Sequence, residues 1–310
     1  MLTCGLWGEE DNRGEKKSQV MEWSGYIQTQ FTHSTQATDS FQMRRARLKL
    51  IGEITDSIFY KLQLSAKGTP VLLDAQIDIK FSPYASLRFG QFKVPFSLEN
   101  LTSSSSLDFI NRSPSVENLC PGRDIGSSGR DIGVLIYGKA AHIEYSLGVF
   151  NGSGKNRLDN NEHKDLSGRL VCSPFNSLSL GFSYYSGKHN RNEAQPAAKK
   201  NRKGLELKYV KGRFSLKSEF ILAQDKELER QGLYVQGAYF FRPKKTEFLI
   251  RYSHLDNQKH QKGEYHKIIN LGWNRHISEK TKFQINLEFH NQEPFPGRYI
   301  VLMALFQAGF

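Results

Sequence analysis

Three arginines and a lysine are closely spaced in residues 41–50, which run Phe-Gln-Met-Arg-Arg-Ala-Arg-Leu-Lys-Leu. If this segment is extended, Arg45, Arg47 and Lys49 share one face at intervals of roughly 6.5–7 Å, given a rise of about 3.3–3.4 Å per residue. Guanidinium groups offer paired N–H donors to an oxyanion. The spacing therefore predicts a basic ladder that passes or binds small anions. The same alternation places Arg44 on the opposite face, near an interface.

Neighbouring segments extend this basic face. The alternation puts six cations on it, opposed by two carboxylates, Asp74 and Asp78; the cations are Arg45, Arg47, Lys49, Lys61, Lys80 and Arg88. Later segments place fewer cations than carboxylates on the same face; these are Lys208, Lys217 and Arg251 against Glu144, Glu206, Glu219, Glu247 and Glu288. We expect a polarised wall whose basic side adjoins the longest loop.

The elements that carry these residues follow a period of two, which is typical of β-strands. In 71–81, apolar residues alternate with Asp74, Gln76, Asp78 and Lys80. Sixteen such segments can be traced, most of them longer than the five or six residues usual for soluble strands. They span 21–32, 41–52, 57–66, 71–81, 84–93, 131–138, 141–150, 165–172, 177–186, 203–210, 213–223, 232–241, 246–254, 266–275, 281–290 and 299–310.

Composition narrows the function classes. The 310 residues carry a net charge of +12, which invites nucleic acid, an anionic membrane surface or a small anion as partner. The longest apolar run, 299–306, is far shorter than the roughly 18 residues of a membrane-spanning helix. Cys4, Cys120 and Cys172 are too few for a disulfide scaffold and lack metal-ligand spacing. We therefore expect no metal and no cofactor.

The pattern predicts an all-β fold, a sixteen-stranded antiparallel transmembrane β-barrel. A soluble sandwich or propeller would also alternate, but its inner face would be a crowded apolar core. Here one face is heavily polar, which suits a water-filled lumen, while the other suits lipid. Connections after odd-numbered segments are mostly long, as at 33–40, 94–130 and 151–164, and those after even-numbered segments are short. Outer-membrane barrels alternate in this way.

The 94–130 connection is too long to be idle in a compact domain. Its apolar residues would be poorly placed in bulk water, and it carries the hydroxyls of Ser103, Ser104, Ser105 and Ser106 together with Arg112, Arg123 and Arg130. We expect it to fold into the barrel as a constriction; an extracellular surface loop is the alternative.

The two ends of the chain differ in character. The last segment ends on Phe310, on the same face as Ile300, Leu302 and Phe306, and a terminal phenylalanine resembles the signal that the bacterial outer-membrane assembly machinery reads. Residues 1–19 lack the apolar stretch of a signal peptide and are expected to be a disordered lead-in or leader remnant before a single pore domain at 20–310.

Several stretches resemble the phosphate-selective porins O and P. They are Arg-Arg-Ala-Arg-Leu at 44–48, Leu-Asp-Ala at 73–75, Gly-Gln-Phe-Lys-Val-Pro-Phe-Ser-Leu-Glu at 90–99, Pro-Gly-Arg-Asp-Ile-Gly at 121–126 and Gly-Val-Phe-Asn-Gly-Ser-Gly-Lys-Asn at 148–156. The resemblance implies homotrimeric barrels in the outer membrane of a Gram-negative-type bacterium, with the third loop folded into each pore. It also implies that Arg44, Arg45 and Arg47 lie near a constriction that binds phosphate or polyphosphate, with Asp74 opposed to them.

The expected function is passive diffusion of phosphate, polyphosphate and chloride across the outer-membrane lipid. A general diffusion porin without phosphate preference is the main alternative. A hydrolase within the barrel is more distant, since Asn-Gly-Ser-Gly at 151–154 lacks the strand-to-helix context of a nucleophile turn. Nucleic-acid binding would need outward cations beside stacking aromatics, whereas Phe89, Phe182 and Trp273 lie opposite the cations.

Overall fold

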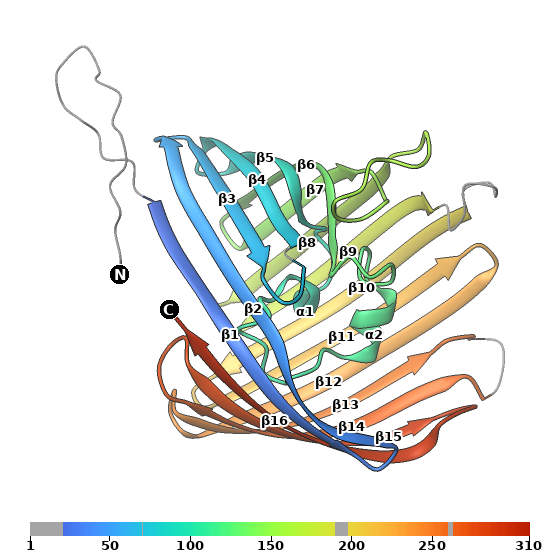
Figure 1. The fold of residues 1–310 in the computed structure, drawn as a ribbon. Coiled ribbons are helices and arrows are strands. Elements are labelled where there is room, and N and C mark those ends of the chain that lie inside the picture. The colour runs from blue at the N-terminus through green and yellow to red at the C-terminus, as the bar shows by residue number, and fades with distance from the viewer. Residues whose placement is uncertain (1–20, 70, 190–197, 260–262) are drawn as a thin grey trace.

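A computed structural model describes residues 21–69, 71–189, 198–259 and 263–310. Within these ranges sixteen antiparallel strands form one closed barrel, which confirms the predicted fold class, and β1 completes the ring by pairing with β16 (Figure 1). No helix in these ranges is long and apolar enough to cross a membrane. The expectations for 1–19 and for Cys4 fall outside the described residues.

The strand bounds agree closely with the alternating segments. The strands are β1 (Met21–Ser34), β2 (Ala37–Thr55), β3 (Ile58–Ser65), β4 (Val71–Ser82), β5 (Ala85–Lys93), β6 (Arg130–Ala140), β7 (Ile143–Phe150), β8 (Asp165–Phe175), β9 (Leu178–His189), β10 (Ala198–Lys211), β11 (Phe214–Asp225), β12 (Leu228–Arg242), β13 (Thr246–Asp256), β14 (Tyr265–His276), β15 (Lys282–Gln292) and β16 (Gly297–Gly309). The helices are α1 (Leu98–Leu101) and α2 (Pro114–Leu119).

Along the strands, most apolar residues face outward and most polar residues face inward. Leu180 and Phe182 of β9 are exposed on the outside, while Ser183 is buried on the inside. This arrangement suits both lipid and water, because lipid meets the apolar face and each strand pairs with its two neighbours in the ring. At the junction the Gly25 N–H donates to the Phe310 carbonyl at 3.1 Å, and the Phe310 N–H donates to the Gly25 carbonyl at 3.0 Å.

The ends of the barrel differ as predicted, with one exception. We call the end that carries 94–129 and 151–164 the loop end and the opposite one the turn end. The prediction of a long loop at 33–40 is wrong, because β1 and β2 continue as strands to a two-residue turn at 35–36. The turn is fixed at its tip, where the Thr35 N–H donates to the Ile300 carbonyl at 3.1 Å.

The β1–β2 hairpin extends beyond the neighbouring strand β3 at the loop end. Strand β2 has 19 residues and β3 has 8, and their pairing starts at Arg47 opposite Ser65. Among the described residues, 37–45 of β2 therefore have no strand partner on the side away from β1. Phe41, in the middle of this free edge, is 87% exposed.

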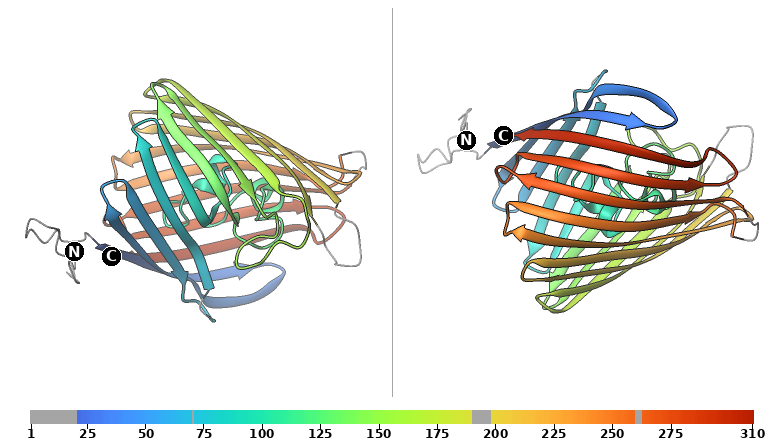
Figure 2. Two further views of the ribbon diagram at one scale, coloured as in Figure 1. Left: turned by 90° about the horizontal axis from the view of Figure 1, so that it is seen from above. Right: turned by 90° about the horizontal axis from the view of Figure 1, so that it is seen from below.

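The third loop fills the middle of the barrel, which confirms the expected inward fold. Figure 2 shows α1 and α2 enclosed by the ring of strands. The loop contributes Phe96, Val116, Leu119 and Cys120 to an apolar cluster that also contains wall residues, among them Tyr185, Ile221 and Tyr234. Burial raises the pKa of the Cys120 thiol, so this cysteine is an inert part of the cluster.

Candidate functional site

The path of the third loop through the lumen is set first by the start of α1. Ser97 caps this helix by accepting the Asn100 N–H at 3.1 Å. The buried carboxylate of Glu219, on β11, accepts the N–H groups of Leu98 at 3.0 Å and Glu99 at 2.7 Å. The first N–H groups of a helix have no partner within it, so a carboxylate at this place satisfies two of them.

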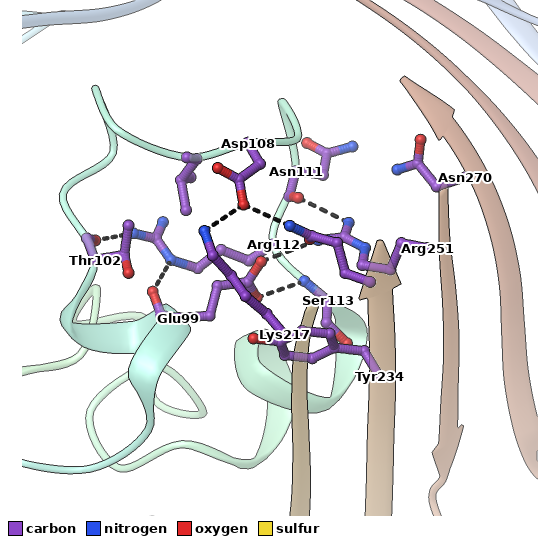
Figure 3. A network of polar contacts seen from close by, with 12 residues as sticks. Glu99, Thr102, Asp108, Asn111, Arg112, Ser113, Lys217, Tyr234, Arg251 and Asn270 are labelled. Carbon is purple, nitrogen blue, oxygen red and sulfur yellow. Dashed lines mark hydrogen bonds and ion pairs between the residues drawn. The ribbon is translucent and has the colours of Figure 1, made fainter. Parts of the chain in front are cut away.

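Two ion pairs hold the third loop, at Glu99 and Asp108, against strands β11 and β13 of the wall (Figure 3). Arg251 of β13 contacts Glu99 at 2.9 Å and also donates to the Asn111 carbonyl at 2.9 Å. Lys217 of β11 contacts Asp108 at 2.6 Å. The third loop is thus bound by three charged residues that the alternation placed on the lumen face of the later strands. These are Lys217, Glu219 and Arg251, and they contact the loop instead of facing open water.

Two further cations, Lys93 of β5 and Arg123 of the loop, also stabilise the fold of the third loop. The Lys93 ammonium donates to the carbonyls of Asn100, Leu101 and Thr102, at 2.7, 3.1 and 2.8 Å, where α1 ends. Arg123 donates to Asn100 Oδ1 at 2.6 Å and pairs with Glu117 at 2.8 Å. The loop is therefore a rigid insert with polar anchors at both of its helices.

A bulge in β2 changes the position of Arg44. Gln28 of β1 lies opposite Arg45, but the next residue, Thr29, lies opposite Met43, so Arg44 is the extra residue. A bulged residue departs from the strict alternation of a strand. The prediction that Arg44 faces outward near an interface is wrong: its guanidinium donates to the Ile110 carbonyl at 3.1 Å and to Asn111 Oδ1 at 2.7 Å, inside the barrel.

With Arg44 turned inward, six arginines line one cavity of about 440 Å³ on the loop side of the constriction, which we call the arginine cavity. They are Arg44, Arg45, Arg47, Arg112, Arg123 and Arg130. Its described lining also includes two carboxylates, Glu117 and Glu288, and two imidazoles, His266 and His290. The cations outnumber the carboxylates there, so the cavity attracts anions.

Some donors of this cavity have no partner. The Nε–H groups of Arg44 and Arg47 are buried without a hydrogen bond within the described structure. Other donors are committed, since Arg45 donates to Gln28 Oε1 at 2.9 Å and Arg112 donates to the Thr102 carbonyl at 2.8 Å. Burial, with a further effect of nearby Arg123, lowers the pKa of Arg112 to about 10, so it stays charged at neutral pH.

A second cavity of about 180 Å³, the turn-side cavity, continues the basic ladder toward the turn end. Arg47 lines both cavities, and Lys49 lines the second. The serine tract divides in the same way: Ser104 lines the arginine cavity and accepts from Arg47 at 3.1 Å, while Ser103, Ser105 and Ser106 line the turn-side cavity.

Other predicted site residues lie elsewhere. Asp74 contacts Arg130 at 2.7 Å and Lys61 at 2.8 Å, so its single negative charge is shared by these two cations, and in the described residues it forms no ion pair with an arginine of β2. Arg88 pairs with Asp78 at 2.7 Å and stacks over Tyr137, beside a different cavity of about 400 Å³.

Lys80, on the lumen side near the turn end, is exposed and lines none of these three cavities. The structure therefore brings together Arg44, Arg45, Arg47, Arg112 and Arg123 but separates them from Lys80 and Arg88.

Sequence reasoning missed several residues of the arginine cavity. His290 has the same alternation as Glu288, two residues earlier on β15, and that spacing could have placed it in the lumen. His266 likewise has the alternation of Asn270 and Asn274 on β14. Asn111 and Glu117 carry no comparable local signal, because their approach depends on how the third loop crosses the barrel.

No group of histidine, cysteine, aspartate and glutamate side chains in the described ranges could hold a metal ion. Ser153, at the nucleophile-like turn, is 2% exposed, and its hydroxyl donates to Asn160 at 3.1 Å.

The structure resembles several solved porins at low sequence identity. An anion-selective porin from Comamonas acidovorans has a TM-score of 0.72 at 12% identity, covering 94% of this chain and 100% of that one. The trimer form of OmpT from Vibrio cholerae has a TM-score of 0.70 at 11% identity, covering 94% and 99%. The outer-membrane channel DcaP of Acinetobacter baumannii has 0.69 at 10%, covering 98% and 100%.

Sequence comparison gives the family. No curated protein is significantly similar to the chain. The family model described as phosphate-selective porin O and P matches residues 21–293, nearly the whole described barrel. The closed sixteen-stranded ring, the inserted third loop and this match together show that the chain is a porin of the Gram-negative outer membrane and belongs to the phosphate-selective porin O and P family.

Proposed function

We propose that residues 20–310 form one pore unit for passive diffusion of small anions, with 94–130 as its constriction. Anions would move from the arginine cavity, past Arg47 and Ser104, to Lys49 and the turn-side cavity. The shared position of Arg47 between the two cavities supports this path. The solved porin from Comamonas acidovorans is anion-selective by its title, which agrees with the proposal.

The observation that carries the proposal is the pair of unpartnered Nε–H groups on Arg44 and Arg47. A buried donor without an acceptor costs about 1–3 kcal/mol, and an entering anion removes that cost. Phosphate and polyphosphate offer several acceptor oxygens and can take two N–H donors from one guanidinium. Chloride is the simplest permeant ion, and phosphate groups are the preferred ligands in this proposal.

The test is single-channel recording of refolded protein in a planar bilayer under a KCl gradient, followed by phosphate titration. We expect a reversal potential that shows chloride preference, and block of the current by phosphate. Arg45→Ala and Arg47→Ala should both weaken the block. Arg88→Gln is the matched control, because Arg88 lies outside the arginine cavity and should leave the block unchanged.

Cation preference would overturn the anion proposal. An ohmic current that phosphate does not affect would leave the alternative, a general diffusion porin. We also propose that the pore has no enzymatic activity, and the buried, hydrogen-bonded Ser153 supports this.

Assembly partners are a further part of the proposal. The free edge of β2 at 37–45 exposes unpaired backbone groups beside Phe41, and such an edge is normally covered. We infer that a second copy of the chain covers it within a homotrimer. The terminal Phe310, whose backbone closes the ring with Gly25, is proposed as the signal for the outer-membrane assembly machinery.

A further inference from the structure

A chain of two imidazoles and one carboxylate borders the arginine cavity. His266 Nε2 lies 2.9 Å from His290 Nδ1, and His290 Nε2 lies 3.0 Å from Glu288 Oε2. The His290 ring stacks on Tyr299, with centroids 4.3 Å apart and an interplanar angle of 12°. His290 and Glu288 are 8% and 2% exposed, so the chain is held in one geometry.

With Glu288 ionised and both imidazoles neutral, one arrangement of the protons satisfies both contacts. An ionised Glu288 only accepts, so His290 donates its Nε2–H to the carboxylate and its Nδ1 accepts from His266 Nε2–H. In this state both imidazoles are neutral, and the chain carries the single negative charge of Glu288. Uptake of one proton by the imidazole pair brings the net charge of the chain to zero.

The chain is coupled to the arginines. Asn111 accepts from Arg44 at 2.7 Å, and its amide lies 3.4 Å from Glu288 Oε1. Among the described residues, the charged groups that share the arginine cavity with the chain are Glu117 of α2 and the six arginines, of which Arg44 of β2 interacts electrostatically with Glu288. From β16 it meets Tyr299. Arginine and tyrosine keep one charge state across the pH range in which an ordinary histidine titrates, and a solvated glutamate stays ionised through most of it.

We infer that the His266–His290–Glu288 chain is a selectivity-determining element of the pore, and that its protonation strengthens the preference for anions. This rests on the proposed anion path through the arginine cavity. At neutral pH the charge of Glu288 offsets part of the positive potential felt by an entering anion. In acid the offset is lost, while all six arginines remain charged.

The experiment measures reversal potentials of the wild-type pore under a KCl gradient at a series of pH values from about 7.5 down to about 4.5. Chloride does not titrate, so any change belongs to the protein. We expect the ratio of anion to cation permeability to rise roughly fivefold on acidification, because one unit charge about 5 Å from the ion favours anions and disfavours cations by about twofold each in a wet lumen.

Variants separate the parts of the chain. His290→Gln should abolish the rise. Glu288→Gln should show the high acid-state preference already at neutral pH. The matched control is His276→Gln, because His276 forms a similar pair with Glu247 at 3.0 Å, is only partly buried and does not line the arginine cavity. This control should keep the full rise.

A wild-type permeability ratio that does not change with pH would overturn the inference without requiring any variant to fold. Retention of the rise in folded His290→Gln would also overturn it. An anion-selective pore without pH dependence leaves the proposed function standing, whereas a cation-selective pore at every pH value of the series removes the proposed function itself.

Discussion

At the scale of single residues, the bulge at Arg44 adds a cation that strict alternation would have given to the lipid face. Its Nε–H has no partner among the described residues, so it is free to donate to an anion. We predict that Arg44→Gln weakens phosphate block about tenfold, the loss expected for a hydrogen bond to a charged group. Titration of phosphate against single-channel current measures it. Lys80→Gln is the control, and an unchanged block in Arg44→Gln would contradict the assignment.

At the scale of elements, the constriction depends on how the wall holds α1. Glu219 accepts from the N–H groups of Leu98 and Glu99 and from the Tyr234 hydroxyl, at 2.8 Å for the last. An amide has one acceptor oxygen, so Glu219→Gln leaves buried donors unpaired at about 1–3 kcal/mol.

We expect larger and noisier single-channel conductance from Glu219→Gln, because the loop start is released while the barrel still forms. Glu144→Gln provides the control, since Glu144 pairs with Lys139 near the turn end and both are exposed. A conductance trace identical to wild type would show that α1 does not depend on this carboxylate.

At the scale of the whole molecule, the wall is uneven in height because β2 is longer than β3. The free edge of β2 at 37–45 exposes Phe41. We predict that Phe41→Arg converts trimers to monomers without loss of barrel folding, at a cost of about 2 kcal/mol for each contact. Native mass measurement in detergent checks this. Phe241→Arg, on the outside of β12, should remain trimeric; an unaltered oligomer for Phe41→Arg, or a monomeric wild type, would contradict the proposed interface.

Local sequence was sufficient to predict those features that depend on a single strand. The period of two placed all sixteen strands, and it put Arg45, Arg47 and Lys49 in the lumen, because side-chain direction in a strand depends only on position along it. The inward third loop could be expected from its length and apolar residues. The same local rule failed at Arg44, since a bulge is a property of two paired strands.

What the sequence by itself determined is therefore the barrel, its two faces and the basic side of its lumen. Only the tertiary structure decided which of those charges are available. Asp74 is taken by Arg130 and Lys61, Arg251 by Glu99, and the His266–His290 pair forms across two strands. Such contacts join segments that are distant in the chain, and they depend on strand register and on the loop's path through the lumen.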